Sequence, residues 1–262
     1  MASTLRQVSH VFVGGKRAMS EFINRRQLSR AFAALVAGLT LMTTAQAQDY
    51  QAIVALPDRT DSDRQMDKRR DPVSLLGFTA PKSGWSVLDM GAGAGYSTEL
   101  MARAVGPTGK VYAQVAKESE KLQGRMASAA MAKVTVLVRP FDDPVPADVR
   151  DLDLITFYFA YHDTTYMEVD RAKMNKALYA SLKPGGWLVM ADHSARPEDG
   201  ATVGKTFHRI AEQSLRAEIE AAGFKFVDSG DFLRHPEDKR TDVVFRNPTP
   251  VDEFVMKFQK PK

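Results

Sequence analysis

Three glycines within five residues, Gly91, Gly93 and Gly95, constrain the fold of this chain most. They separate a short apolar run at residues 87–90 from a helix-like stretch at residues 96–105. Glycine lets the backbone turn sharply and lets a ligand approach without meeting a Cβ atom. A helix that follows such a loop presents unpaired backbone N–H groups to that ligand. The pattern therefore predicts a strand, a ligand-binding loop and a helix at the carboxyl edge of an α/β sheet.

The remainder of the chain alternates apolar runs with helix-like stretches. We expect strands at residues 87–90, 110–115, 134–138, 152–159 and 187–191, with closing strands at 224–227, 243–246 and 253–258. We expect helices at residues 63–70, 96–105, 118–131, 165–182 and 205–222. Thr165 and Glu168 form a capping-box pattern for the fourth of these helices. The alternation predicts one α/β domain with a mainly parallel sheet and helices on both faces.

The spacing of the glycines, and the aspartate before them, indicate which cofactor the loop binds. The dinucleotide-binding fingerprint places its third glycine five residues after the first, whereas Gly95 lies four residues after Gly91. Asp89 precedes the loop, and a carboxylate is a poor neighbour for a pyrophosphate but a good one for a cation. S-adenosylmethionine carries a sulfonium and an ammonium group and no phosphate. The loop therefore favours S-adenosylmethionine over a nicotinamide dinucleotide.

Composition excludes several classes of function. The chain has no cysteine, which rules out disulfides, thiolate catalysis and cysteine–zinc sites. The net charge is +4, but residues 1–47 hold six basic side chains and one acidic side chain, so the rest has 30 basic and 31 acidic residues. No basic run interleaved with aromatic residues follows, as a nucleic-acid interface would need. We therefore expect no nucleic-acid partner.

Residues 1–47 have the order of a secretory signal peptide. Basic residues precede a 12-residue apolar run at 31–42, and Ala45-Gln46-Ala47 then offers a cleavage site. A spanning helix needs about 20 apolar residues, so we expect no stable membrane anchor. The segment Arg25-Arg26-Gln27-Leu28 also resembles a twin-arginine signal. We predict an exported protein, periplasmic or secreted, with an N-terminal extension at 48–80 and its main domain at 81–262.

Two segments carry a family resemblance. VLDMGAGAGYSTEL resembles motif I of the class I S-adenosylmethionine-dependent methyltransferases, and LKPGGWLVMAD resembles their segment around the fifth strand. The similarity runs from about residue 64 to residue 261. Segments such as DRQMDKRRDP, YHD and VMKFQKP are similar to a group of exported bacterial proteins described as predicted methyltransferases. The resemblance implies the Rossmann-like fold of that class, with a seven-stranded sheet, and S-adenosylmethionine as cofactor.

The same resemblance implies which residues touch the cofactor. They are Asp89, Gly91, Gly93, Gly95 and Tyr96 around the glycine loop, Gln114 at the ribose hydroxyls, and Asp142, with Asp143 as an alternative, at the adenine amine. Gln114 departs from the family, most of whose members carry an acid there. A neutral amide makes a hydrogen bond about half as strong as a charge-assisted one. The departure indicates weaker cofactor affinity or a changed ligand.

Two clusters follow the expected fourth and fifth strands, where catalytic groups of such a fold are expected. Tyr161-His162-Asp163 ends one strand and Asp192-His193-Ser194 ends the other, and His208 is a further candidate. Histidine titrates near neutral pH and suits a general base. We predict His162, Asp163 and His193 as catalytic residues, the alternative being ordinary hydrogen-bonded residues at strand ends. Four of these side chains could also bind a divalent ion: His162, Asp163, Asp192 and His193. Their spacing in the sequence does not show whether they meet in space, so we predict no metal site.

The leading interpretation is an exported S-adenosylmethionine-dependent methyltransferase that acts on a small molecule. The alternative is an exported binding protein that keeps the fold but does not catalyse methyl transfer. Two observations favour it: Gln114 replaces the usual acid, and an exported protein is separated from the cytoplasm, where the cofactor is made. An oxidoreductase that uses a nicotinamide cofactor is disfavoured by the glycine spacing and by Asp89. The methyl acceptor and the oligomeric state cannot be derived from the sequence.

Overall fold

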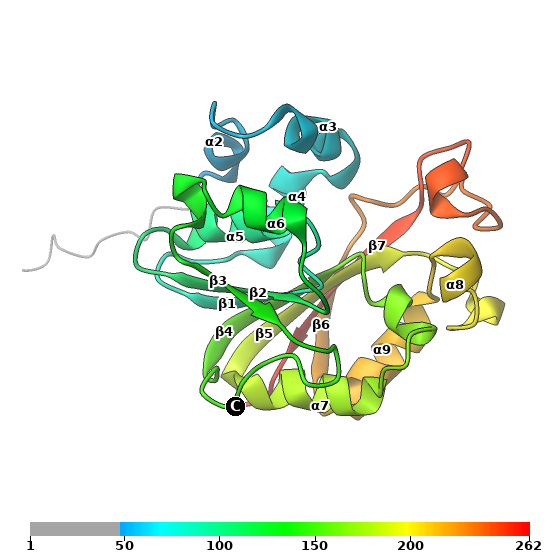
Figure 1. Ribbon diagram of the computed structural model, residues 1–262. Coiled ribbons are helices and arrows are strands. Elements are labelled where there is room, and N and C mark those ends of the chain that lie inside the picture. The colour runs from blue at the N-terminus through cyan, green and yellow to red at the C-terminus, as the bar shows by residue number, and fades with distance from the viewer. Residues whose placement is uncertain (1–47) are drawn as a thin grey trace, which may run out of the picture. The chain divides into compact units, whose positions relative to one another are not determined.

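A seven-stranded sheet of order β3-β2-β1-β4-β5-β7-β6 organises residues 48–262, the part of the chain that the computed structural model describes (Figure 1). The strands are β1 (Ser86–Met90), β2 (Lys110–Val115), β3 (Val134–Val138), β4 (Leu152–Tyr158), β5 (Leu182–His193), β6 (Lys225–Gly230) and β7 (Glu253–Gln259). The first five pair in parallel, and β7 is antiparallel to both β5 and β6. Strand order reverses between β1 and β4. The predicted fold, a mainly parallel seven-stranded sheet of the class I methyltransferase type, is thereby confirmed.

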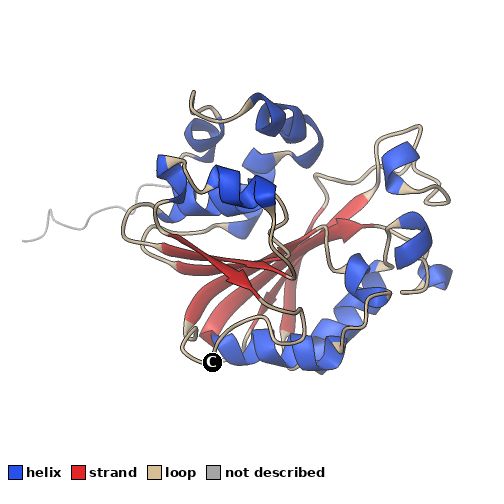
Figure 2. Ribbon diagram, viewed as in Figure 1, coloured by secondary structure: helices blue, strands red, loops and turns tan. Residues whose placement is uncertain are grey.

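Helices cover both faces of this sheet (Figure 2). On one face lie α2 (Tyr50–Val54), α3 (Asp61–Arg70), α4 (Pro72–Thr79), α5 (Tyr96–Val105) and α6 (Glu120–Arg125). On the other face lie α7 (Arg171–Ser181) and α9 (Glu212–Ala221). Because both faces are covered, the central strand β4 reads as an apolar run, and Leu154, Ile155 and Phe157 are fully buried.

The segment before β1 contains more structure than its polar sequence indicates. The predicted helix at 63–70 is confirmed as α3, and Asp71, with a φ of 37°, ends it in the left-handed region. Pro72 then begins α4, which the sequence analysis did not predict, and the side chain of Asp71 accepts a hydrogen bond from the backbone N–H of Ser74. Proline suits the first turn of a helix because its missing N–H would have no partner there. The split of the chain at residue 80 stays a prediction.

The capping box predicted at Thr165 and Glu168 is wrong. A single turn of 3-10 helix, η2 (His162–Thr165), occupies this position, and the Thr165 hydroxyl donates to the backbone carbonyl of His162. The helix that follows, α7, begins at Arg171. Asp170 caps it by accepting from the backbone N–H of Lys173. Aspartate is as good an N-cap as threonine, so local sequence alone did not decide between the two.

The predicted helix at 205–222 is interrupted. It forms as α8 (Gly204–Phe207) and α9, and His208 between them has a φ of 55°. Arg209 explains the break, because its side chain is completely buried and donates to Asp238 at 2.7 Å and to the Ser194 carbonyl at 3.0 Å. A buried charge needs such partners, and a continuous helix would present the side chain elsewhere.

Two further expectations need correction. Residues 118–131 form α6 and a separate turn, η1 (Ala129–Met131), rather than one helix. Residues 243–246 form the turn η4 (Val244–Arg246) and not a strand, so β6 and β7 alone close the sheet. A last turn, η3 (Pro197–Asp199), follows β5. The predicted signal peptide, residues 1–47, lies outside the described residues. Within residues 48–262 no helix has the length and apolarity to cross a membrane.

Candidate functional site

The glycine loop lies at the point where strand order reverses. Gly91, Gly93 and Gly95 all have positive φ angles, 62°, 56° and 82°, which side chains with a Cβ rarely adopt. A Cβ on Gly91 would lie 3.0 Å from the Cβ of Ala160, and one on Gly95 would lie 2.7 Å from Leu122. No side chain caps the first turn of α5. The loop is thus shaped for close approach, and its helix N-terminus is available to a ligand.

Asp89 supports this loop from inside the protein. Its carboxylate is buried and accepts hydrogen bonds from the hydroxyls of Ser97, Thr98 and Thr156, at 2.8, 2.6 and 2.8 Å. Burial raises the pKa of Asp89 although these three hydrogen bonds oppose the shift. The carboxylate therefore ties β1 to α5 and β4. The predicted contact between Asp89 and the cofactor stays a prediction.

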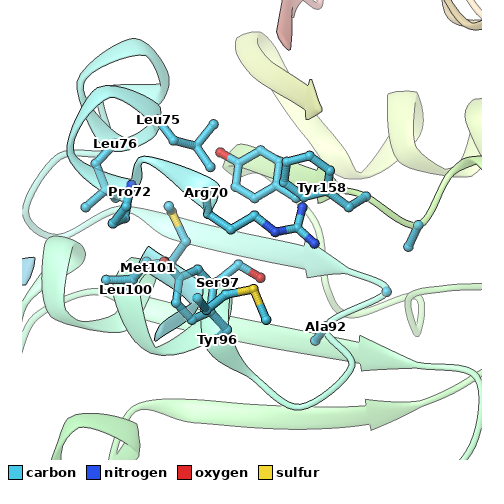
Figure 3. Close-up of a pocket in the computed structure, with 14 residues that line it drawn as sticks. Arg70, Pro72, Leu75, Leu76, Ala92, Tyr96, Ser97, Leu100, Met101 and Tyr158 are labelled. Carbon is cyan, nitrogen blue, oxygen red and sulfur yellow. The ribbon is translucent and has the colours of Figure 1, made fainter. Parts of the chain in front are cut away.

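A cavity of about 210 Å³ opens beside the glycine loop (Figure 3). Its walls come from α3, α4, α5, the glycine loop and the end of β4, through Met66, Arg70, Pro72, Leu75, Leu76, Gly91, Ala92, Tyr96, Ser97, Leu100, Met101, Tyr158, Phe159 and Ala160. Of the residues predicted to bind the cofactor, Gly91 and Tyr96 line it. The other five, Asp89, Gly93, Gly95, Gln114 and Asp142, do not. The cavity therefore touches only a small part of the predicted cofactor site.

The hydroxyl groups of the cavity wall already have partners. Tyr96 donates to Asp67 at 2.7 Å, Ser97 donates to Asp89, and the hydroxyls of Tyr158 and Thr79 lie 2.6 Å apart. Burial raises the pKa of the Tyr96 and Tyr158 hydroxyls. These groups are therefore neutral hydrogen-bonding groups at physiological pH, and none of them is poised as a base.

Arg70 is different, because its Nη1 atom is buried and has no hydrogen-bond partner among residues 48–262. The side chain extends from α3 between Tyr158 and Tyr96 (Figure 3). Its guanidinium carbon lies 3.3 Å from the centre of the Phe159 ring. Burial lowers the pKa of Arg70 to about 10, so the group stays cationic at neutral pH. An unpaired buried donor costs free energy, and a cation in this position favours an anionic ligand.

Gln114 is fully buried at the end of β2. Its Oε1 accepts a hydrogen bond from the backbone N–H of Gly91 at 3.0 Å, and its Nε2 donates to the carbonyl of Arg139 at 2.6 Å. Both ends of the amide are thus used within the protein. Asp142 pairs with Lys173 at 3.4 Å, and Asp143 pairs with Arg139. The predicted ribose and adenine contacts are not tested by these positions.

The two predicted histidine clusters converge at the ends of β4 and β5. His162 is buried, with Nδ1 2.6 Å from Asp192 Oδ1 and Nε2 3.2 Å from Asp163 Oδ1. Burial alone would lower the pKa of His162, but the two carboxylates raise it to about 10. Hydrogen bonds from His162 and Tyr166 outweigh burial and lower the pKa of Asp163 to about 2. In this arrangement each ring nitrogen of His162 faces a carboxylate oxygen.

His193, the third predicted catalytic residue, lies behind Phe159, with 5.3 Å between the ring centres. Its Nδ1 is 2.8 Å from Glu253 Oε1, but the two atoms do not have hydrogen-bond geometry, and neither has a hydrogen-bond partner among residues 48–262. Glu253 Oε1 also lies 3.9 Å from Arg69 Nη2. Burial lowers the pKa of His193 well below its ordinary value despite the nearby Asp192 carboxylate. Burial also raises the pKa of Glu253 to about 7, against the influence of Arg70. His193 is therefore a neutral imidazole.

Two residues of this edge, Arg70 and Glu253, were not predicted. Arg70 ends the charged run Lys68-Arg69-Arg70, which reads as the ordinary basic end of a helix. Its burial depends on α4, which folds back over it. Glu253 did give a signal, because an acid at the start of a predicted apolar strand is unusual in a protein core.

Comparisons with known proteins agree with this architecture. Residues 73–197 match the model of the family described as protein-L-isoaspartate(D-aspartate) O-methyltransferase. A ubiquinone/menaquinone biosynthesis C-methyltransferase from Escherichia coli is 30% identical over 161 residues, 60% of this chain and 62% of that protein. Its counterpart from Burkholderia multivorans is 30% identical over 113 residues, 43% of this chain and 45% of that protein. The chain thus spans about half the length of these curated relatives.

Solved structures share the fold. A methyltransferase from Aquifex aeolicus, described as dependent on S-adenosylmethionine, has a TM-score of 0.56 at 20% identity and covers 77% of this chain and 100% of its own. The 1,6-didemethyltoxoflavin-N1-methyltransferase of Burkholderia thailandensis was solved with S-adenosylhomocysteine. It has a TM-score of 0.50 at 17% identity, and the match covers 95% of this chain and 94% of that one. The chain is thus similar over part of its sequence to the superfamily of class I S-adenosylmethionine-dependent methyltransferases, and it shares their fold. S-adenosylmethionine is the cofactor that this superfamily uses.

Proposed function

We propose that this protein transfers a methyl group from S-adenosylmethionine to a small, mainly apolar acceptor in the cavity beside the glycine loop. The observation that carries the proposal is the buried, unpaired Nη1 of Arg70 in a cavity that also touches Gly91 and Ala92. Similarity to this superfamily indicates the cofactor, and the cavity offers a site next to it for a second molecule.

The residues present fit this cofactor. When bound, S-adenosylmethionine supplies an electrophilic methyl group on a sulfonium. The three glycines give its amino-acid end close access to the backbone, and Arg70 offers a cation for a carboxylate. That carboxylate belongs either to the cofactor or to the acceptor, and the binding experiments below distinguish the two.

The cavity wall indicates the class of acceptor. Leu75, Leu76, Leu100 and Met101 make one side apolar, so an acceptor with a hydrocarbon or aromatic body is favoured. The lining contains no carboxylate and no imidazole. Both ring nitrogens of His162 face carboxylates, so neither points into the cavity, and the ring of His193 lies 5.3 Å from that of Phe159 and does not line the cavity. We therefore favour acceptors whose nucleophilic atom ionises without a strong base, such as carboxylic acids and acidic phenols.

Turnover is tested directly with the full chain and labelled S-adenosylmethionine against a panel of small carboxylic acids, phenols and quinols. We expect label transfer to at least one acidic acceptor and loss of transfer in Gly93→Val, because residue 93 has a φ of 56°. Glu220→Gln, at an exposed position on α9, is the matched control. Binding of cofactor without transfer to any acceptor would favour the second candidate function.

That second candidate is a binding protein that keeps the fold without turnover. Gln114 favours it, because both ends of its side chain are bonded to the protein's own backbone and neither end is free for a ribose. The affinity for S-adenosylhomocysteine, the demethylated product, together with the absence of transfer would identify such a protein.

We also propose that the protein is exported, on the basis of the leader pattern in residues 1–47. Expression of the full chain in a bacterium should yield a product that begins at Gln48 and appears in the periplasm or the medium. Replacement of Arg25 and Arg26 by lysine distinguishes folded export from ordinary secretion, because only the twin-arginine route requires the pair. An uncleaved product that stays in the cytoplasm would contradict export.

A further inference from the structure

Three side chains outside the cavity converge on one point near the surface. His162 Nε2 lies 3.2 Å from Asp163 Oδ1, and His208 Nδ1 lies 3.5 Å from the same oxygen. All three ligand atoms lie within 4.8 Å of one another. In a tetrahedral zinc site with bonds of about 2.0–2.1 Å, neighbouring ligand atoms are about 3.3 Å apart. Both measured distances are close to this value.

His162 also has the hydrogen bond that orients a metal-binding imidazole. Its Nδ1 lies 2.6 Å from the carboxylate of Asp192, which is fully buried. The same carboxylate accepts from the backbone N–H groups of His162 and His193, at 2.8 Å each. A carboxylate on the far nitrogen fixes the ring and directs Nε2 towards the ion, as it does in many metal sites.

The charges of the cluster leave room for a cation. Asp163 and Asp192 flank His162, and neither has an arginine or lysine partner among the salt bridges of residues 48–262. Elsewhere in this part of the chain, buried carboxylates such as Asp63 and Asp238 are paired with arginines. The two carboxylates of the cluster thus have only histidines as ion-pair partners in the described residues, and a bound cation would add the positive charge that arginine supplies elsewhere.

The backbone holds the three ligands in place. A Cβ on Gly204 would lie 2.1 Å from the Thr165 hydroxyl and 2.6 Å from the carbonyl of His162, so the start of α8 touches η2 directly. The backbone N–H of His208 donates to the carbonyl of Gly204 at 3.0 Å. Close contact between α8 and η2 thus delivers His208 to the other two ligands without any need for a long flexible side chain.

We propose that His162, Asp163 and His208 bind one divalent transition-metal ion of the zinc class. Two imidazole nitrogens and one carboxylate oxygen suit such ions better than magnesium or calcium, which prefer oxygen ligands. Three protein ligands leave a fourth position, and the partial exposure of Asp163 and His208 makes it accessible. Asp192 orients a ligand, and His193 faces Glu253, so neither completes the set.

The test is calorimetric titration of the untagged full chain, stripped with a chelator and then dialysed, with zinc chloride. We expect one equivalent to bind with a Kd in the micromolar range or below, and a rise of several degrees in Tm with bound zinc. Cobalt(II) in the same site should give the strong visible absorption of a low-coordinate site. No cofactor or acceptor is present, so the result is independent of the proposed methyl transfer.

His208→Asn is the informative variant, because asparagine accepts the left-handed backbone conformation that His208 adopts at a φ of 55°. It should weaken zinc binding at least tenfold, as should Asp163→Asn. His235→Asn, at an exposed histidine in another loop, is the matched control and should bind as the unaltered protein does. Absence of binding to the folded chain, or equal binding by the His208→Asn and control variants, would overturn the proposal.

Discussion

Two regions of the protein differ in how they compensate buried charge. On one side, between α3, α5 and α6, Arg125 donates to Asp63 at 2.8 Å, to Glu99 at 2.5 Å and to the carbonyl of Ala94 at 3.0 Å. On the other side, around the end of β5 and the start of β7, Arg70 Nη1, His193 Nδ1 and Glu253 Oε1 are buried without hydrogen-bond partners among residues 48–262. The first arrangement stabilises the fold. The second costs stability, and strongly shifted, uncompensated groups of this kind are characteristic of functional sites.

The largest expected effect is on the paired side. Arg125→Met should lower the free energy of unfolding by about 3 kcal/mol, because it leaves Asp63 buried without its cation. Urea denaturation followed by circular dichroism measures the change. Glu220→Gln, which removes an exposed pair with Arg216, is the control and should cost less than about 0.5 kcal/mol. Equal effects of the two substitutions would remove the contrast.

The unpaired side should reveal itself in the dependence of stability on pH. Burial raises the pKa of Glu253 from 4.5 to about 7. The folded protein therefore holds this proton more tightly than the unfolded chain does, and the stabilisation is complete below pH 4.5 and is lost as the pH rises to about 7. The charged and titratable groups around Glu253 are Arg69 and Arg70 of α3, Asp192 and His193 of β5, and His235 before β7.

Glu253→Gln should remove this component, which amounts to about 3 kcal/mol across the window. Urea denaturation at intervals from pH 4.5 to 8 measures the free energy of unfolding of both proteins. As the pH rises, the variant should become increasingly more stable than the unaltered protein. Glu220→Gln, at an exposed position on α9, should leave the pH dependence of the unaltered protein in place. Parallel curves for Glu253→Gln and the unaltered protein would contradict the assignment.

A smaller effect is expected at Gln114, a buried polar residue whose hydrogen bonds are all made. Gln114→Met removes both the acceptor for the N–H of Gly91 and the donor to the carbonyl of Arg139, without adding a charge. We expect a loss of about 1–2 kcal/mol in the free energy of unfolding at pH 7.5. Gln213→Met, exposed on α9, is the control. An unchanged stability would show that the amide contributes less than its geometry indicates.

The smallest effect on stability is expected at Arg70. Arg70→Gln removes a buried cation that has no hydrogen-bond partner at Nη1, so the free energy of unfolding should change by less than about 1 kcal/mol. The contrast with Arg125→Met, measured by the same denaturation, is the sharpest form of the comparison. A loss of about 3 kcal/mol would show that Arg70 serves the fold in the same way.

The sequence predicted elements well where periodicity and glycine placement agree with the final structure. Helix α5 and strands β2 and β3 have the bounds that were expected, and the glycine loop has the positive φ angles that its composition implies. The pattern failed where a distant partner decides the local conformation. Helix 205–222 breaks because Arg209 pairs with Asp238, and apolar spacing on one side of a helix does not record that contact.

The site was predictable in part for the same reason. Parallel strands end at one edge, so His162 and His193 could be expected near each other, and their ring centres are 5.4 Å apart. Their protonation states could not be predicted, because these depend on Asp192 and Glu253, which reach the site through strand pairing. Arg70 was missed because its burial requires α4.

Calorimetric titration of S-adenosylhomocysteine into the full chain and into Arg70→Gln tests the central claim most directly. We expect micromolar or tighter binding to the unaltered protein. If Arg70 binds the carboxylate of the cofactor, the variant should bind S-adenosylhomocysteine at least tenfold more weakly. If Arg70 binds a carboxylate of the acceptor instead, the variant should keep its affinity for S-adenosylhomocysteine, and the KM for the acceptor should rise. Absence of binding to the folded, unaltered protein would contradict the account, as would a variant that matches the unaltered protein in both cofactor affinity and acceptor KM.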